Sequence, residues 1–180
     1  SERGMKINAP RTPGIGMFSD DIRDAVKGHV FYMDELGFVN GAADRGEELK
    51  QAVTCAKWAK SPMQSINYLS CHDNYTLWDR FIISNSHESE EMRIRMNKLA
   101  AAILFTAQGI PFFLHGEEFA RTKISEADGT PVENSYCSPL SVNAIDYDRA
   151  EQFSDLKAYY KGLIALRRAH KSFYLDTVDE

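Results

Sequence analysis

A long amphipathic segment that runs straight into a short apolar one constrains the possible fold more than any other feature. Residues 89–108 have the spacing of a helix with one continuous apolar stripe. The stripe consists of Met92, Met96, Leu99 and Ile103. Gly109 follows, where a left-handed residue commonly ends a helix. Residues 110–115 are then apolar except for the last, which is typical of a parallel strand covered on both faces.

Short apolar runs and helical segments alternate along the rest of the chain as well. We expect further strands at residues 14–18 and 66–70. Ser19, Asp44 and Asp148 are expected to cap helices, the last two as capping boxes with the glutamates three residues later. This order predicts right-handed βαβ units in a parallel sheet, and it leaves open whether the sheet is open or part of a barrel.

The composition argues against several classes of partner and cofactor. A formal net charge of -5 gives no reason to expect a nucleic acid or an anionic membrane as partner. No apolar run has the length that a bilayer span requires. The three cysteines, Cys55, Cys71 and Cys137, are odd in number and widely spaced, which favours free thiols over a disulfide framework or a zinc site. We therefore expect no metal and no cofactor.

The strongest functional signal lies in residues 70–74, with the sequence SCHDN, at the end of the second expected strand. A histidine and a carboxylate side by side at a strand-to-helix turn are exposed on a rigid base, and active sites of parallel α/β enzymes form at such turns. The alternative is structural. Asp73 could cap the next helix while His72 lies in the core.

Five motifs in a fixed order give the chain a family resemblance. They are YLSCHDN at 68–74, GIPFFLHGEEF at 109–119, RTK at 121–123, ENSY at 133–136 and VNAIDY at 142–147. This series resembles the type I pullulanases, which are debranching enzymes of the α-amylase superfamily. Upstream, GIGMFSDDIRDAVKG at 14–28 and GFVNG at 37–41 look like the segment that precedes the first motif in that family. The resemblance runs from about Pro13 to Arg168.

The resemblance implies a fold and a reaction. It implies a (β/α)8 TIM barrel, of which residues 1–180 would be a partial catalytic domain that supplies strands six to eight with their helices and contains no complete second domain. It also implies hydrolysis, with retention, of α-1,6-glucosidic branch points in pullulan, amylopectin or glycogen. The expected partner is therefore an α-glucan polysaccharide.

The resemblance also assigns roles to residues. Asp73 matches the family's third carboxylate, which stabilises the oxocarbenium-like transition state, and His72 matches the neighbour that hydrogen-bonds the same sugar. Asn134 and Tyr136 lie in a polar loop that lines the cleft in this family. Arg121 is expected either to reach that cleft or to tie down a nearby glutamate.

The nucleophile and the general acid of the family are expected upstream of residue 14, and neither motif occurs in this chain. We therefore expect the isolated chain to be inactive. Glu117 and Glu118 are expected to be structural, by capping a turn or by pairing with Arg121. A non-catalytic glucan-binding fragment and a purely structural fragment are the alternatives.

Three strands taken from a barrel leave two open edges and an uncovered apolar face. Such a surface predicts self-association, or pairing with the upstream part of the barrel. Elsewhere we expect Trp78 in the core and Asp79 on a solvated helix face. His87 and Glu91 are four residues apart, and we interpret them as a solvated helix face rather than a metal site.

Overall fold

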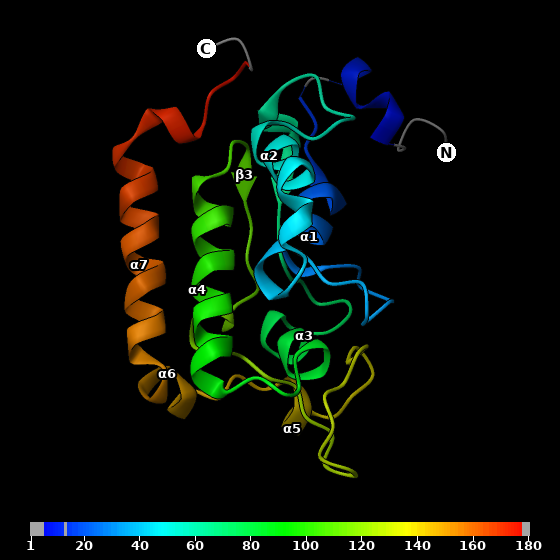
Figure 1. The fold of residues 1–180 in the computed structure, drawn as a ribbon, viewed down its shortest axis with the longest axis vertical. Helices are drawn as coiled ribbons and strands as arrows, with labels where there is room; N and C mark the ends of the chain where they lie inside the picture. The colour runs from blue at the N-terminus through cyan, green and yellow to red at the C-terminus, as the bar shows by residue number, and fades with distance from the viewer. Residues whose placement is uncertain (1–5, 13, 178–180) are drawn as a thin grey trace.

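The computed structural model describes residues 6–12 and 14–177, and Pro13, where the family resemblance is expected to begin, lies outside these ranges. Figure 1 shows a mixed arrangement of short strands and helices. The strands are β1 (Met17–Ser19), β2 (Ser65–Asn67) and β3 (Ile110–Pro111). The helices are α1 (Asp20–Lys27), α2 (Gly46–Thr54), α3 (Leu77–Ser84), α4 (Glu90–Thr106), α5 (Leu140–Asn143), α6 (Asp148–Gln152) and α7 (Ser154–Ala169).

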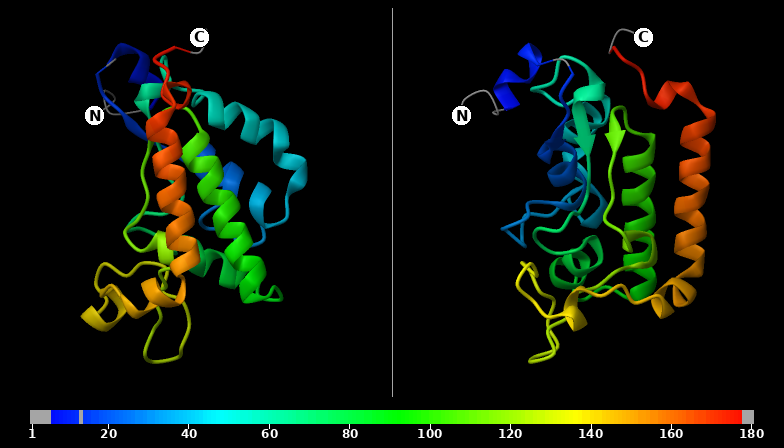
Figure 2. Two further views of the ribbon diagram at one scale, coloured as in Figure 1. Left: turned by 90° about the vertical axis from the view of Figure 1, so that its left-hand side faces the viewer. Right: turned by 180° about the vertical axis from the view of Figure 1, so that it is seen from behind.

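The three strands form one parallel sheet in the order β1-β2-β3. Phe18 of β1 lies opposite Ile66 of β2, which lies opposite Ile110 of β3. Helices separate successive strands, so the predicted α/β class and parallel sheet are confirmed. In Figures 1 and 2, helix α4 lies between β3 and α7. The sheet is therefore backed by two helical layers on that side.

The expected strands are all present, but each is shorter than predicted. Of the predicted strand at 110–115, only Ile110 and Pro111 form a β-strand. Ile110 and Phe112 are both 38% exposed, so the prediction of cover on both faces is wrong for this chain. A strand covered on one side needs apolar side chains on that side alone, so an apolar run does not reveal how many faces of the strand are covered.

Helix α4 confirms the clearest sequence prediction, while its buried face is different from the predicted one. The Ser89 hydroxyl accepts a hydrogen bond from the backbone N–H of Met92 at 3.1 Å, which caps the first turn. Met92 and Leu99 of the predicted stripe are 37% and 44% exposed. The buried face consists of Met96, Asn97, Ala100, Ala101, Leu104 and Phe105. The small alanines on this face let α4 pack closely against its neighbours. This close packing, rather than the size of the side chains, determines which face of α4 is buried.

The other predicted caps are wrong. Ser19 occupies the first position before α1, yet its buried hydroxyl makes no cap hydrogen bond. Asp44 lies inside a 3₁₀ turn, Ala43–Arg45, so α2 begins after Arg45 without a side-chain cap. The box expected from Asp148 is absent because Tyr147 precedes α6.

The last predicted helix is interrupted at Phe153, between α6 and α7. Phe153 is 4% exposed, and its ring packs edge-on against Trp78 with centroids 5.3 Å apart. A single straight helix would have to satisfy this contact and the packing of α7 on α4 together. The break allows both contacts. The packing of Phe153 on Trp78 confirms Trp78 as a core residue.

Gly109 takes a left-handed conformation, with φ at 92°, in the turn between α4 and β3. A Cβ at this position would lie 2.8 Å from the carbonyl oxygens of Pro62 and Ser65. The predicted left-handed glycine is therefore confirmed, although the helix itself ends at Thr106, with Ala107 as its C-cap. The glycine brings β3 against β2 rather than capping α4.

One face of the sheet is uncovered and apolar. Phe18 is 42% exposed, and its ring lies edge-on to Tyr68 at 4.9 Å and to Phe112 at 5.3 Å.

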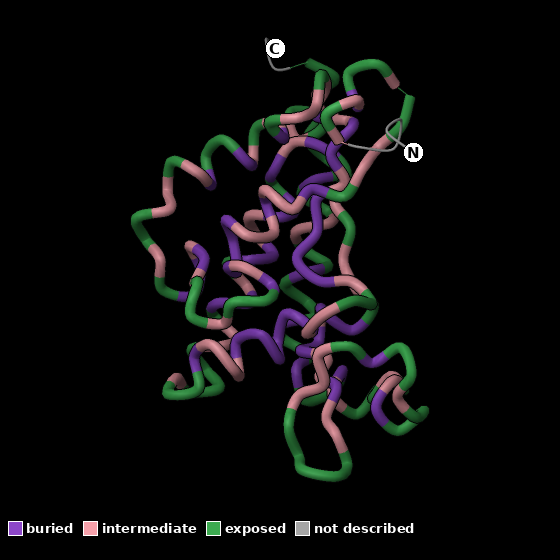
Figure 3. Tube along the Cα trace, turned by 90° about the vertical axis from the view of Figure 1, so that its right-hand side faces the viewer, coloured by how far each residue is buried: buried purple, intermediate pink, exposed green. Residues whose placement is uncertain are grey.

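Buried segments, purple in Figure 3, gather in the interior of the molecule. The tip of the polar loop at residues 126–130 is exposed. No helix among the described residues is long and apolar enough to cross a membrane.

Candidate functional site

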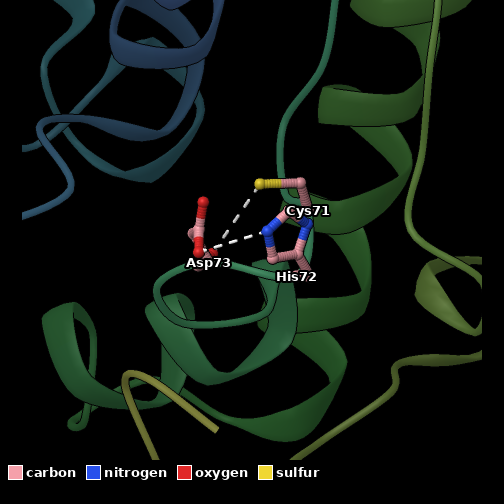
Figure 4. A group of neighbouring side chains, drawn as sticks. All are labelled: Cys71, His72 and Asp73. Carbon is pink, nitrogen blue, oxygen red and sulfur yellow. Dashed lines mark hydrogen bonds and ion pairs between the residues drawn. The ribbon is translucent and has the colours of Figure 1, made fainter. Parts of the chain in front are cut away.

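The turn after β2 presents a histidine and a carboxylate to solvent. The side chains of His72 and Asp73 are 81% and 63% exposed, and Nε2 of the histidine lies 3.3 Å from Oδ1 of the aspartate. Figure 4 shows both side chains on the loop that leads from β2 to α3. Helix α3 is capped by Thr76, whose hydroxyl accepts from the backbone N–H of Asp79 at 3.1 Å. The alternative in which Asp73 caps this helix and His72 is buried is therefore wrong.

A second loop contacts this turn. Asn74 has φ at 59°, a left-handed conformation, and its backbone N–H donates to Oδ1 of Asn134 at 3.3 Å. This contact brings together two segments that are 60 residues apart in the sequence. Tyr136, from the same loop, is 83% exposed. Its ring is free to meet a ligand from solution.

Arg121 holds the chain that follows β3. Its Nη1 donates to the carbonyl oxygen of His115 at 3.0 Å, and its Nη2 donates to that of Asn143 at 2.7 Å. Burial lowers the pKa of the Arg121 guanidinium. Of the two expected roles, pairing with a glutamate is wrong, because the guanidinium instead ties two backbone segments together.

Glu117 lies beneath the turn, not in it. Its side chain is buried, and it accepts hydrogen bonds from the hydroxyls of Ser70 and Tyr160. Burial raises the pKa of Glu117 to about 7, while burial lowers the pKa of nearby Lys27 to about 8. Since Ser70 directly precedes Cys71, Glu117 anchors the base of the exposed turn. Its structural role was predicted, but its partners were not.

The neighbouring Glu118 caps a turn, as expected. Its Oε2 accepts a hydrogen bond from the backbone N–H of Gly116 at 2.9 Å. Gly116 itself has φ at 96°. Glu118 therefore stabilises the turn that leads from β3 towards Arg121.

Asp79 is a buried carboxylate that the sequence analysis placed on a solvated face. It is 0% exposed, and it accepts from the backbone N–H of Lys123 at 2.9 Å and from the Thr122 hydroxyl. Burial raises its pKa. The three-residue spacing of Thr76 and Asp79 could have placed Asp79 in the first turn of a helix, but it gives no signal of the burial. Asp79 fixes the polar loop to α3, on the same side as the turn.

One group of metal-binding side chains converges among the described residues. Cys71, His72 and Asp73 each offer one ligand atom, and these atoms lie within 4.8 Å of one another. By contrast, His87 pairs with Glu88 at 3.4 Å and Glu91 pairs with Arg95 at 2.7 Å. His87 and Glu91 thus have separate partners.

Comparison with known proteins gives a consistent result. No protein-family model matches the chain. A pullulanase of Bacillus subtilis strain 168 is 41% identical over 97% of this chain and 24% of its own length. Pullulanase 1, chloroplastic, of Arabidopsis thaliana is 30% identical over 82% of this chain and 20% of its own length. The chain therefore spans about a quarter or less of these curated relatives.

Solved structures are similar over nearly the whole chain. A pullulanase of Anoxybacillus sp. LM18-11, complexed with maltotriose, gives a TM-score of 0.91 at 42% identity, covering 97% of this chain and 24% of that one. A pullulanase of Paenibacillus barengoltzii, in complex with maltohexaose and α-cyclodextrin, gives a TM-score of 0.87 at 44% identity, covering 97% and 27%. Both the sequence and the fold of this chain thus resemble one part of a larger protein.

Proposed function

We propose that this chain, which is homologous to part of the type I pullulanases, supplies the transition-state-stabilising carboxylate of a retaining glycoside hydrolase. The parent protein would cleave α-1,6-glucosidic branch points in pullulan, amylopectin or glycogen. The observation that carries this proposal is the exposed pair of His72 and Asp73 on the turn that follows β2. In retaining hydrolysis, positive charge develops on the sugar ring, and a preorganised carboxylate stabilises it.

The neighbouring residues take roles that fit their exposure. His72 hydrogen-bonds a hydroxyl of the glucose that Asp73 holds. Asn134 supports the turn through Asn74 and lies at the edge of the cleft. The exposed ring of Tyr136 offers a flat apolar face for a glucose ring and a hydroxyl for its edge. Arg121 contributes by fixing the cleft wall, since both terminal nitrogens already donate to backbone carbonyls.

The sheet would be strands six to eight of a (β/α)8 barrel. Three features support this: the parallel order β1-β2-β3, the helices between the strands, and the uncovered face around Phe18 and Phe112. In a complete barrel the remaining strands would continue both edges of this sheet. The nucleophile and the general acid would lie on that upstream part, so the isolated chain would be inactive as one partial domain.

The uncovered face also leads us to expect association of the isolated chain, either with itself or with the upstream part of the barrel. Exposed apolar surface of this kind usually finds a partner. Light scattering on the purified chain would measure this, and Phe18→Ser should shift the mass towards a monomer. Ile7→Ser is the matched control, because Ile7 is 78% exposed and belongs to the 3₁₀ helix Lys6–Arg11 rather than to a strand. A monomer at every concentration would refute self-association.

A graft tests the catalytic proposal directly. The matching segment of the Bacillus subtilis pullulanase would be replaced by this chain, and release of reducing sugar from pullulan would be measured. We expect hydrolysis by the graft and none by the isolated chain. Circular dichroism and a cooperative thermal transition would verify that the graft is folded. A folded graft that does not hydrolyse pullulan would refute the proposal, and so would hydrolysis by the chain alone.

A further inference from the structure

Three consecutive side chains at the exposed turn offer a sulfur, a nitrogen and an oxygen to one point in space. One ligand atom each from Cys71, His72 and Asp73 lies within 4.8 Å of the other two. The thiol of Cys71 also lies 3.9 Å from the backbone carbonyl oxygen of Asp73. Figure 4 shows the sulfur and a ring nitrogen both facing Asp73. The three groups therefore converge without any rearrangement of the fold.

These separations fit a single tetrahedral metal ion. Distances of about 2.0–2.3 Å from a zinc ion to its ligand atoms place any two ligand atoms of a tetrahedral site about 3.3–3.8 Å apart. His72 Nε2 and Asp73 Oδ1 are already 3.3 Å apart. The Cys71 sulfur lies within 4.8 Å of the other two ligand atoms, at most about 1 Å beyond this range. A thiolate and an imidazole select zinc and related transition metals over calcium and magnesium, which prefer oxygen ligands.

The backbone that carries the three ligands is fixed. Asn74 closes the turn in a left-handed conformation, and its N–H is bound by Asn134. Below the turn, the Ser70 hydroxyl donates to the buried carboxylate of Glu117. The side chains of His72 and Asp73 are exposed, so an ion can reach them from solution.

One neighbouring charge opposes a cation here. The ammonium of Lys123 interacts electrostatically with Cys71 and Asp73, and it donates to the Ser135 hydroxyl at 2.6 Å. Binding of a metal ion would release the thiol proton, so that a thiolate and a carboxylate would then face this single positive charge. Its presence predicts moderate rather than tight affinity.

We propose that Cys71, His72 and Asp73 form a binding site for zinc or a similar transition-metal cation, with water as the fourth ligand. This site does not depend on the proposed glucan chemistry, although it uses two of the same side chains. A bound ion would therefore withdraw His72 and Asp73 from a sugar.

Cobalt(II) is the probe, because it replaces zinc and reports its ligands by absorption. The reduced chain would be titrated with Co²⁺ alone under anaerobic conditions. We expect a near-ultraviolet cobalt–thiolate band and the visible bands of tetrahedral cobalt, with a stoichiometry of one ion per chain. Added Zn²⁺ should abolish these bands. Cys71→Ser should remove the thiolate band. His72→Gln and Asp73→Asn should each weaken binding at least about tenfold, as loss of even a supporting residue does at metal sites.

Two other cysteines provide matched controls. Cys55→Ser and Cys137→Ser should leave the spectrum and the affinity unchanged, since neither thiol belongs to the group. The proposal is refuted if a control removes the band, or if His72→Gln and Asp73→Asn bind like the parent chain. It is also refuted if two chains share each ion, or if no band forms at millimolar cobalt.

Discussion

Two carboxylates lie near the end of strand β2 in opposite environments. The Asp73 side chain is 63% exposed, and its Oδ1 lies 3.3 Å from Nε2 of the histidine beside it. Glu117 is 3% exposed and accepts hydrogen bonds from Ser70 and Tyr160. Ser70, which donates to Glu117, lies only three residues before Asp73 in the sequence. An exposed carboxylate with few internal partners is available to a ligand, whereas a buried one with several partners is committed to the fold.

Under the proposed function, Glu117 would position the turn and Asp73 would bind the ligand. Glu117 carries the electrostatic cost of burial, since its pKa rises to about 7, and it uses its hydrogen bonds to hold Ser70. The backbone that follows Ser70 then presents Asp73 to solvent from a rigid base. Loss of Glu117 should therefore appear mainly as lost stability, and loss of Asp73 mainly as lost activity.

The largest expected effect is that of Asp73→Asn in the Bacillus subtilis graft. If Asp73 stabilises the charge of the transition state, kcat on pullulan should fall by about 10²–10³-fold or more. The midpoint of thermal unfolding should hardly change, because surface substitutions usually alter stability by less than about 0.5 kcal/mol. Asp128→Asn, an exposed carboxylate at the tip of the polar loop, is the control. Equal activity of Asp73→Asn and Asp128→Asn would contradict the proposed role of Asp73.

Glu117→Ala should have the opposite profile in the isolated chain. The hydroxyls of Ser70 and Tyr160 lose their shared acceptor and a cavity forms, so the free energy of unfolding should fall by about 2–4 kcal/mol. Urea unfolding followed by circular dichroism measures this loss. Glu118→Ala removes one cap to Gly116 and should cost about 1 kcal/mol. An equally small loss at both glutamates would show that Glu117 is not the anchor.

The pH dependence of stability sharpens the same contrast. The pKa of Glu117 is raised from 4.5 to about 7, so the folded state binds a proton that the unfolded state has released between these values. The free energy of unfolding should therefore fall as pH rises through this window, by up to about 1.4 kcal/mol per unit. Lys27, whose pKa is lowered to about 8, should reverse the trend above that pH. Glu117→Gln should flatten the slope below pH 7, and an unchanged slope would contradict the assignment.

The sequence predicted the exposed region better than the buried one. The turn at 70–74 combines a strand end with adjacent polar residues, and both signals are local. The pairing of Ser70 with Glu117 joins residues 47 positions apart, which no local pattern encodes. Asp79 shows the same limit, because its partners Thr122 and Lys123 belong to a distant loop.

The fold divides in a similar way. The alternation of strands and helices was predictable, because it rests on periodicity within each segment. The buried face of α4 was not, because packing at Ala100 and Ala101 outweighs the size of Met92 and Leu99. The helix break at Phe153 likewise depends on a contact with Trp78 from α3. Tertiary contacts decide such details, and a single sequence carries them only weakly.

The smallest expected effect concerns the contact between the two loops at the exposed site. Asn134→Ala removes one exposed hydrogen bond, to the backbone of Asn74 at 3.3 Å, so the free energy of unfolding should fall by about 0.5–1 kcal/mol. In the graft, kcat/KM on pullulan should fall several-fold, because the left-handed residue after Asp73 loses its external support. Asn8→Ala, outside both loops, is the control for graft activity. Should Asn134→Ala leave kcat/KM unchanged, the turn would be held from below by Glu117 alone, and the positioning role would belong entirely to the buried acid.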